Sequence, residues 1–343
     1  MPLRITQGQE NAPIAPLVNQ VVAVLGFGNQ GHAHALNLRE SGIQVVVANR
    51  GESENGRAAR QAGFSPLSIP EVVAAAKLVI IALPDEVQPD VLSSEVFPHL
   101  RHDAVLGFLH GFTIRFGLVQ PPAGIGVIMV APKGPGATLR ERFLRGKGIP
   151  CLLAVHQDSP QRDAEAMGLA WANGIGCARA GIIHTTFKDE TDTDLFGEQA
   201  VLCGGMTQLI VAAYETLVNA GYPPELAYLE CCHEVKQVAD LVIERGLGGM
   251  MKAISNTAEF GAYQAGPLLI NREVRETMKA ILARIEAGDF ASDFTRDHQQ
   301  GFPWFHERRE ALQTHPIEHA GRIVRAVISR SDAAEHSNTD IQL

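Results

Sequence analysis

The stretch VVAVLGFGNQG, residues 21–31, decides the fold of the first half of the chain. Its apolar residues run directly into a turn in which Gly26, Gly28 and Gly31 have the spacing G-x-G-x-x-G. Between a strand and a helix, this spacing is typical of dinucleotide-binding folds. The glycines permit a tight turn and let the backbone approach a pyrophosphate at the helix N-terminus. The stretch therefore predicts a nucleotide-binding α/β domain.

Further apolar runs on both sides of this stretch predict more strands of the buried, parallel type. They alternate with amphipathic segments at 30–40, 56–62 and 161–173. This alternation predicts a doubly wound, Rossmann-type α/β sheet. The predicted strands are 21–25, 43–47, 77–83, 104–108, 126–132 and 151–155.

The strand pattern stops near Thr186, and helical periodicity follows. The predicted helices are 195–219, 224–245, 272–287, 305–312 and 318–328, with loops at 221–224 and 265–270. We therefore expect three regions: a Rossmann-type domain at 1–186, an all-helical domain at 187–330 and a disordered polar tail at 331–343.

The composition limits the classes of partner. The chain has 343 residues and a formal net charge of −9, without a basic cluster, which argues against nucleic acid. No apolar run reaches the roughly 20 uninterrupted residues of a bilayer span, and the N-terminus does not resemble a secretory signal. The five cysteines lie in apolar runs without metal-finger spacing, as in reduced cytoplasmic proteins. We expect a cytoplasmic enzyme that acts on a small molecule.

The end of the second predicted strand bears on the choice of dinucleotide. An NAD site usually carries an acidic residue there for the ribose 2′-hydroxyl, whereas this chain has Arg50 followed by Ser53. A cation and a hydroxyl suit a 2′-phosphate and favour NADP(H). Glu52 and Glu54 in the same loop would repel that phosphate unless they face water. Use of NAD(H) therefore stays open.

Two pairs of carboxylates suggest a metal site. Asp194 and Glu198 are four residues apart and would project from one face of a helix, and Glu230 and Glu234 repeat the spacing. Like charges at this spacing destabilise a helix, and carboxylates that converge in an apolar setting require a cation. Because only oxygen ligands are offered, Mg²⁺ or Mn²⁺ is favoured over zinc.

The carboxylates just before the first pair have two interpretations. Asp189, Glu190 and Asp192 could contribute to the same site. They could equally form a solvated acidic helix start, with Asp192 or Asp194 as N-cap and the helix dipole tolerating the charge. The sequence leaves both interpretations open.

With these residues in view, the chain resembles the short-form ketol-acid reductoisomerases (acetohydroxyacid isomeroreductases) from about Val21 to Ala326. The resemblance rests on GFGNQGHAHALNL, LPDEVQ, HGFTIRFG, VAPKGPG, TDLFGEQAVLCGG, ECCHE and ISNTAEFG. Such an enzyme converts 2-acetolactate, 2-aceto-2-hydroxybutyrate or a similar 2-hydroxy-2-alkyl-3-oxo acid to a 2,3-dihydroxy acid, in valine and isoleucine synthesis. The resemblance implies a magnesium-promoted alkyl shift, a reduction by NADPH, and a knotted, dimer-forming helical domain.

The resemblance also implies roles for single residues. Asp194 and Glu198 would bind two Mg²⁺ ions, with Asp194 bridging them, and Glu230 and Glu234 would complete the site from a partner subunit. The catalytic side chains would be His110, Lys133 and Glu234, and Ser255 would contact the substrate carboxylate. The cofactor would be lined by Gly26, Phe27, Gly28, Asn29, Gln30, Gly31, Arg50, Ser53, Asp85, Glu86, Val87, Gln88 and Gly136.

Some positions depart from the usual family pattern, and they keep alternatives open. Asn29 and Asn55 stand where Ser is common, and Thr113 and Arg115 replace the commoner Asn and His. A paralogous reductoisomerase with an altered substrate is therefore an alternative. An NADP-dependent β-hydroxyacid dehydrogenase and a catalytically silent nucleotide sensor are two more, and the intact carboxylate pairs disfavour both.

Helix geometry predicts a site shared between subunits. If 195–219 and 224–245 form a simple antiparallel hairpin, the two carboxylate pairs lie roughly 20 Å apart at about 1.5 Å per residue. That distance is too long for shared ions, whereas a twofold axis can bring one pair against the other. We expect a homodimer or a higher homo-oligomer.

Overall fold

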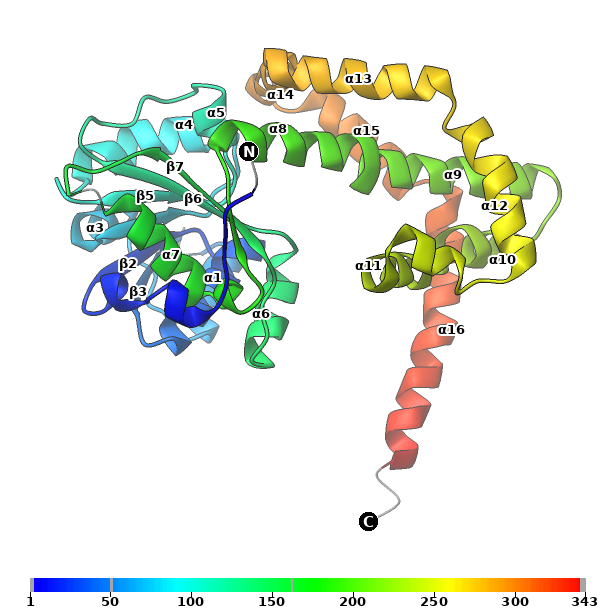
Figure 1. Ribbon diagram of the computed structural model, residues 1–343, viewed down its shortest axis with the longest axis horizontal. Coiled ribbons are helices and arrows are strands. Elements are labelled where there is room, and N and C mark those ends of the chain that lie inside the picture. The colour runs from blue at the N-terminus through cyan, green and yellow to red at the C-terminus, as the bar shows by residue number, and fades with distance from the viewer. Residues whose placement is uncertain (1–2, 50–51, 162, 340–343) are drawn as a thin grey trace. The chain divides into compact units, whose positions relative to one another are not determined.

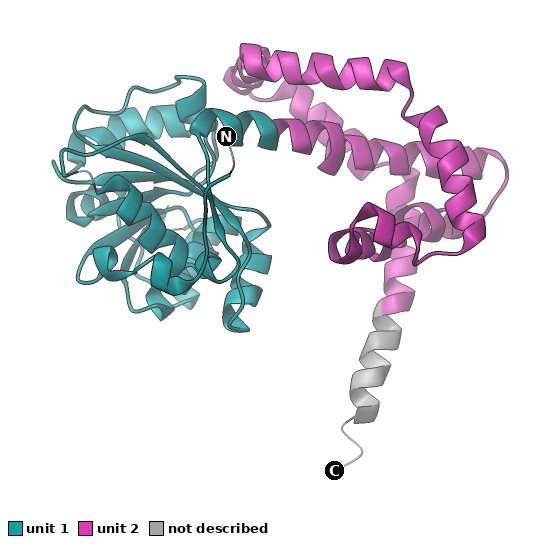
Figure 2. Cartoon of the chain, in the orientation of Figure 1, with its two compact units in different colours: residues 1–194 teal, residues 195–343 magenta. Residues whose placement is uncertain are grey.

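The computed structural model describes residues 3–49, 52–161 and 163–339, with side-chain burial as far as residue 328. The chain divides into two compact units between Asp194 and Leu195 (Figure 2). This division falls inside the helical run Phe187–Asn219. The predicted domain ranges, including the boundary near residue 186, stay predictions.

The first unit is built on one eight-stranded sheet with helices on both faces, in the order β1-β8-β7-β6-β5-β4-β2-β3 (Figure 1). The strands are β1 (Ile5–Thr6), β2 (Val21–Leu25), β3 (Gln44–Ala48), β4 (Leu78–Ile81), β5 (Val105–Phe108), β6 (Gly126–Pro132), β7 (Cys151–Gln157) and β8 (Ile182–His184). From β3 to β6 all neighbours are parallel. β7 runs antiparallel to β6, and β1 runs antiparallel to β8.

All six predicted strands are present, and the Rossmann-type α/β class is confirmed. The prediction that every strand is parallel is wrong for β7. An apolar run reports burial on both faces of a sheet and carries no information on direction. The short strands β1 and β8 were not predicted, since two or three residues give no periodic signal.

Both faces of the sheet are buried, as the continuous apolar runs require. On β2, Val22 and Val24 belong to one apolar cluster, whereas Ala23 and Leu25 belong to the other. Burial of a side chain such as Leu25 contributes about 1.5–3 kcal/mol. The helices of this unit are α1 (Asn29–Glu40), α2 (Glu54–Gln61), α3 (Ile69–Ala75), α4 (Gln88–Val91), α5 (Phe112–Arg115), α6 (Gly136–Leu144) and α7 (Ala164–Gly174).

The remaining helices begin with α8, which spans the division between the units. They are α8 (Phe187–Gly197), η6 (Glu198–Leu202), α9 (Gly204–Asn219), α10 (Pro224–Tyr228), η7 (Leu229–His233), α11 (Val235–Met251), α12 (Asn256–Leu269), α13 (Arg272–Ala287), α14 (Asp289–Gln299), α15 (Pro303–Gln313) and α16 (Pro316–Thr339). The all-helical class of this part is confirmed. The predicted loop at 265–270 is wrong, because α12 continues through Pro267 to Leu269.

The predicted disordered tail, 331–343, stays a prediction. No side-chain burial is described beyond residue 328, and residues 340–343 lie outside the described residues.

The second unit has a small core of its own. Its buried cluster consists of Tyr214, Ala227, Tyr228, Ile317, Ala320 and Val324. Other large apolar side chains on its helices are exposed, such as Ile243 (82%), Leu247 (72%) and Leu268 (77%). Exposed large apolar side chains of this kind, where they are contiguous, usually mark an interface.

The helical run Phe187–Asn219 contains an 18-residue window with a mean hydropathy of 1.4, so that it could cross a membrane by length and composition. The sequence did not predict such a segment. A single helix of this kind is weak evidence for a membrane span, and this one contains Glu198 in its middle.

The turn between β2 and α1 generates a stability prediction. A Cβ at Gly31 would lie 2.3 Å from the Gly26 carbonyl oxygen, whereas a Cβ at Gly28 would meet only the Asn55 amide nitrogen, at 3.6 Å. We expect Gly31→Ala to destabilise the protein by about 1–3 kcal/mol through overpacking. Gly28→Ala, at a φ of −83° that any residue adopts, should cost much less. Thermal denaturation measures both, and equal losses would contradict the close approach at Gly31.

Candidate active site

Four polar side chains meet where β5, β6 and α8 come together. His110 follows β5, Lys133 follows β6, and Glu190 and Asp194 lie on α8. The Lys133 Nζ donates to Glu190 Oε1 at 3.0 Å and to Asp194 Oδ1 at 2.8 Å. The His110 Nδ1 lies 3.2 Å from Glu190 Oε2 and 3.6 Å from Asp194 Oδ2. The carboxyl ends of parallel strands thus carry this cluster, where such sheets usually bind ligands.

Glu190 is the most buried member, with a side chain only 1% exposed. A buried carboxylate requires partners, and Glu190 also accepts from the Gly111 backbone N–H at 3.3 Å. The helix start is fixed separately, since Thr186 Oγ1 accepts from the Asp189 N–H at 3.0 Å. The suggestion that Asp192 or Asp194 caps this helix is therefore wrong. The solvated interpretation holds for the exposed Asp189 but is wrong for Glu190.

The charges in the cluster support one another. Burial lowers the pKa of His110, but hydrogen bonding and charge from Glu190, with further charge from Asp85 and Asp194, raise it to about 9. Burial also opposes the charge on Lys133, but the same two α8 carboxylates raise the pKa of its ammonium group. Burial raises the pKa of Glu190, and contacts with His110 and Lys133 outweigh it, so that this pKa is lowered. At neutral pH the cluster holds two cations against two anions.

One atom each of His110, Glu190 and Asp194 lies within 4.8 Å of the others, close enough to hold one metal ion. It is the only such group of three among the described residues. The two carboxylates suit a hard divalent cation, whereas His110 could coordinate one only through a nitrogen that carries no proton.

The other predicted metal ligands lie on π-helical turns of the second unit. Glu198 opens η6, Glu230 lies in η7, and Glu234 directly follows it. Each turn has the hydrogen bond between residues five apart that defines a π-helix. The Cys203 N–H donates to the Glu198 carbonyl at 2.8 Å, and the Glu234 N–H donates to the Leu229 carbonyl at 3.3 Å. These turns lie inside the predicted helices 195–219 and 224–245, which are therefore helical but not α-helical throughout. π turns inside helices are frequent at functional sites.

A cavity of about 400 Å³ lies beside the cluster, at the end of β2 and β4. It is lined by Gly26, Phe27, Gly28, Asn29, Gln30, Asn55, Ile81, Ala82, Leu83, Pro84, Asp85, Gln88, Leu109 and His110. His110 therefore belongs both to this cavity and to the charged cluster. A dinucleotide pyrophosphate fits its floor, because the cavity includes the glycine turn at the N-terminus of α1.

Comparison with known proteins agrees with this geometry. Residues 16–181 match the family description "Acetohydroxy acid isomeroreductase, NADPH-binding domain", and residues 187–330 match "Ketol-acid reductoisomerase, C-terminal domain". The chain belongs to the ketol-acid reductoisomerase family. A solved NADH-preferring ketol-acid reductoisomerase from an uncultured archean is 40% identical, with a TM-score of 0.91, covering 94% of this chain and 98% of that one.

More distant structures share the fold alone. A semialdehyde dehydrogenase NAD-binding protein from Cupriavidus necator has a TM-score of 0.56 at 18% identity, covering 76% of this chain and 99% of that one. A putative oxidoreductase from Jannaschia sp. CCS1 has a TM-score of 0.57 at 15% identity, covering 78% and 98%. The resemblance read from the motifs is confirmed, and the chain is an NAD(P)H-dependent ketol-acid reductoisomerase of branched-chain amino-acid synthesis.

Of the predicted cofactor positions in this reductoisomerase, several do not line the cavity. Gly31, Ser53, Glu86, Val87 and Gly136 do not line it. Gly136 instead packs on the glycine turn, with its N–H donating to Asn29 Oδ1 at 3.0 Å. Asn29, which replaces the commoner Ser, thereby joins the N-termini of α1 and α6.

Gln88 lines the cavity and also holds its wall together. Its amide donates to the Leu83 carbonyl at 2.9 Å and to Asp85 Oδ1 at 3.0 Å. It accepts from the buried hydroxyl of Thr113 at 2.7 Å. Thr113, another departure from the family pattern, is thus explained as a support for Gln88.

The loop after β3 is partly described. Arg50 lies outside the described residues. Ser53 caps α2, accepting from the Gly56 N–H at 3.0 Å and donating to Asn49 Oδ1 at 2.9 Å. Glu52 is 93% exposed and lies 3.6 Å from Arg60. Ser53 therefore has a structural task besides any contact with a ribose phosphate.

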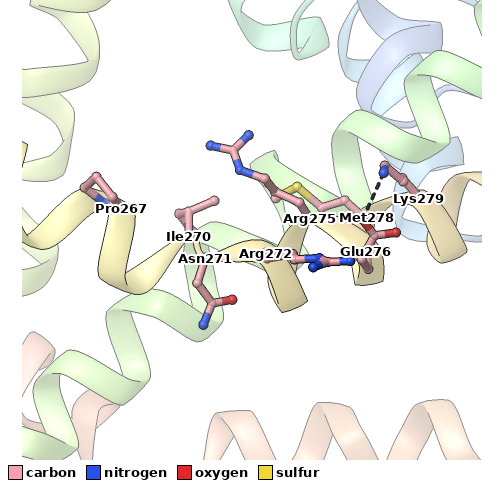
Figure 3. A pocket seen from close by; sticks show the side chains of 8 residues that line it. All are labelled: Pro267, Ile270, Asn271, Arg272, Arg275, Glu276, Met278 and Lys279. Atoms are coloured by element: carbon pink, nitrogen blue, oxygen red, sulfur yellow. Dashed lines mark hydrogen bonds and ion pairs between the residues drawn. The ribbon is translucent and has the colours of Figure 1, made fainter.

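Two features of the second unit complete the placement of predicted residues. The exposed Ser255 caps α12 by accepting from the Ala258 N–H at 3.2 Å. A shallow depression of about 570 Å³ lies at the corner between α12 and α13 (Figure 3). None of the predicted site residues lines it. Its lining consists of Pro267, Ile270, Asn271, Arg272, Arg275, Glu276, Met278 and Lys279. We assign it no role in the reaction.

Glu190 is the site residue that the sequence left undecided, and it generates a prediction. Removing one partner from a buried charge pair costs about 3–5 kcal/mol. We expect Glu190→Gln to lower kcat/KM by about 100-fold or more, because Lys133 and His110 lose their shared anion. The matched control is Asp189→Asn, an exposed carboxylate in the same helix, which should retain activity. Steady-state kinetics of both variants decides, and similar rates would show that burial of Glu190 is unrelated to catalysis.

Proposed function

We propose that this protein is the magnesium-dependent reductoisomerase that converts 2-acetolactate and 2-aceto-2-hydroxybutyrate to the corresponding 2,3-dihydroxy-3-alkyl acids. The observation that carries this proposal is the position of His110, which lines the dinucleotide cavity and contacts the carboxylates of α8. A substrate bound at the cluster would lie next to a nicotinamide in the cavity. The reaction requires this arrangement, because the same substrate undergoes alkyl migration and then reduction.

The donor set fits magnesium. We propose Asp194 and Glu198 as ligands of two Mg²⁺ ions, with Glu230 and Glu234 from a second subunit. All four offer carboxylate oxygen, the ligand that Mg²⁺ prefers. Bound Mg²⁺ would polarise the substrate carbonyl and stabilise the neighbouring alkoxide, and the nicotinamide would supply the hydride.

The protein's own residues then orient carboxylates and move protons. Lys133 donates to the carboxylates of both Glu190 and Asp194, which fixes their orientation relative to each other. His110 and Lys133 are charged at neutral pH and can stabilise developing negative charge. We propose Glu234 as a proton carrier where metal does not occupy it fully, and Ser255 as a contact of the substrate carboxylate.

A second copy of the chain would complete the site. Glu198, Glu230 and Glu234 are exposed in the single chain, and the helices that carry them expose apolar side chains such as Leu202, Leu209 and Ile243. An isologous interface would bury that surface and bring Glu230 and Glu234 of one copy to Asp194 and Glu198 of the other. We propose a homodimer or a higher homo-oligomer in the cytoplasm.

The cofactor is a nicotinamide dinucleotide, and we propose that NADPH is preferred over NADH by a smaller margin than is usual for the family. Arg50 and Ser53 favour the 2′-phosphate, whereas Glu52 and Glu54 oppose it. The structural support is that Glu52 is exposed beside α2 and that the Ser53 hydroxyl already serves the helix cap. The archaeal relative, described as NADH-preferring, is consistent with a narrow margin.

The metal proposal predicts a strict cation requirement. Excess chelator should abolish conversion of 2-acetolactate, and added Mg²⁺ should restore it. Asp194→Asn should abolish activity at every Mg²⁺ concentration, since a neutral amide cannot bridge two cations. Product formation is measured alongside NADPH oxidation. Full turnover in chelator would contradict the metal-dependent mechanism and favour a plain dehydrogenase.

The cofactor proposal predicts the effect of two charge removals. We expect Glu52→Gln with Glu54→Gln to raise the NADPH/NADH ratio of kcat/KM by about 2–30-fold, because exposed charge pairs contribute about 0.2–1 kcal/mol each. Glu141→Gln, an exposed carboxylate on α6, is the control and should leave the ratio unchanged. An unaltered ratio in the double variant would show that the two carboxylates do not face the ribose.

A further inference from the structure

We infer that Arg115 is a positioning residue of the active site, acting through Asp192 to hold α8. The Arg115 guanidinium donates to both oxygens of Asp192, from Nε to Oδ1 at 2.9 Å and from Nη2 to Oδ2 at 3.2 Å. Lys188 donates to the same carboxylate at 2.6 Å. A two-point fork fixes orientation as well as distance, which a single hydrogen bond does not.

This contact lies inside the protein. The Asp192 side chain is 5% exposed and that of Arg115 is 18% exposed, whereas Lys188 is 57% exposed. Arg115 is therefore the partner that can hold Asp192 in the interior, and Lys188 closes the outer side. The solvated interpretation of Asp192 is wrong for this reason. A buried carboxylate of this kind imposes a definite position on its helix, because any rotation would leave it unpaired.

Asp192 lies midway between the two site carboxylates of α8. Successive residues of a helix turn by about 100°, so Asp192 projects about 200° away from both Glu190 and Asp194. Lys133 and His110 contact α8 from the site, and Arg115 contacts it from the other side. The helix is thus held on opposite faces, and the fork sets the rotation that aims both site carboxylates.

Arg115 also connects this anchor to the cofactor wall. It ends α5, and the same short helix carries Thr113, which donates to Gln88 in the cavity lining. One four-residue segment therefore supports both the α8 carboxylates and the loop that carries Asp85.

The inference rests on the proposed metal site for one of its two readouts. We choose Mn²⁺ as the probe and measure its dissociation constant with the substrate-free, cofactor-free protein by electron paramagnetic resonance. Loss of a partner that orients a metal ligand typically weakens metal binding by about 10–100-fold. We expect a loss in that range for Arg115→Met and a smaller one for Arg115→Lys, which keeps the charge but not the fork.

The chain offers a matched control. Arg101 makes the same fork with Asp103, with Nε–Oδ1 and Nη2–Oδ2 distances of 3.0 Å, at the opposite end of β5. Arg101→Met should leave the Mn²⁺ dissociation constant within about twofold, since its carboxylate holds no site helix. An equal loss in both variants would overturn the inference and indicate general destabilisation.

A second variant covers the case in which Arg115→Met does not fold. Arg115→Met combined with Asp192→Asn removes the buried charge together with its partner, which is better tolerated than removing one of them. It should fold and still bind Mn²⁺ more weakly, because the fork is absent. Wild-type affinity in the folded double variant would overturn the positioning role.

The second readout needs no metal. Amide hydrogen exchange of residues 187–197 should be faster in the Arg115 variants and unchanged in Arg101→Met. If the wild-type protein binds no Mn²⁺, the proposed metal site fails, and hydrogen exchange alone decides the positioning role. Unchanged exchange in α8 would overturn it.

Discussion

The burial of charge at the start of α8 is the constraint on which the site depends. Glu190, Thr191 and Asp192 are successive polar residues, and each is at most 3% exposed. Burial of two carboxylates in one turn is tolerated only when cations meet both. Lys133 and His110 meet Glu190, and Arg115 meets Asp192. The helix can therefore occupy one position against the sheet, and that position determines where Asp194 points.

The sheet supplies these cations at the ends of its strands. β5 ends before His110 and β6 ends before Lys133, so two neighbouring parallel strands deliver an imidazole and an ammonium to the same edge. The glycine turn after β2 opens a dinucleotide cavity at this edge, and His110 forms part of its wall. The cavity for the reducing cofactor and the carboxylate cluster therefore lie next to each other. The proposed reductoisomerase mechanism needs both at one substrate.

Local patterns predicted much of this, and long-range pairing determined the rest. The apolar runs predicted six strands, because a strand that is buried on both faces has a continuous apolar sequence. The direction of β7 and the π turns at Glu198 and Glu230 could not be predicted, because neither produces a periodic pattern in a single sequence. Glu190 has the signal of four-residue spacing to Asp194, but its burial depends on partners 57 and 80 residues earlier in the chain. No local pattern could assign those partners.

The central claim is that carboxylates from two copies of the chain act at one site. Subunit exchange between inactive Asp194→Asn and inactive Glu230→Gln chains tests it most directly, with mixed dimers verified by native mass spectrometry. Each mixed dimer would contain one intact site and one site with both changes. At equal mixing, about a quarter of wild-type activity should return if subunits pair at random through a twofold interface. Absence of activity in a sample with proven mixed dimers would contradict a site shared between chains.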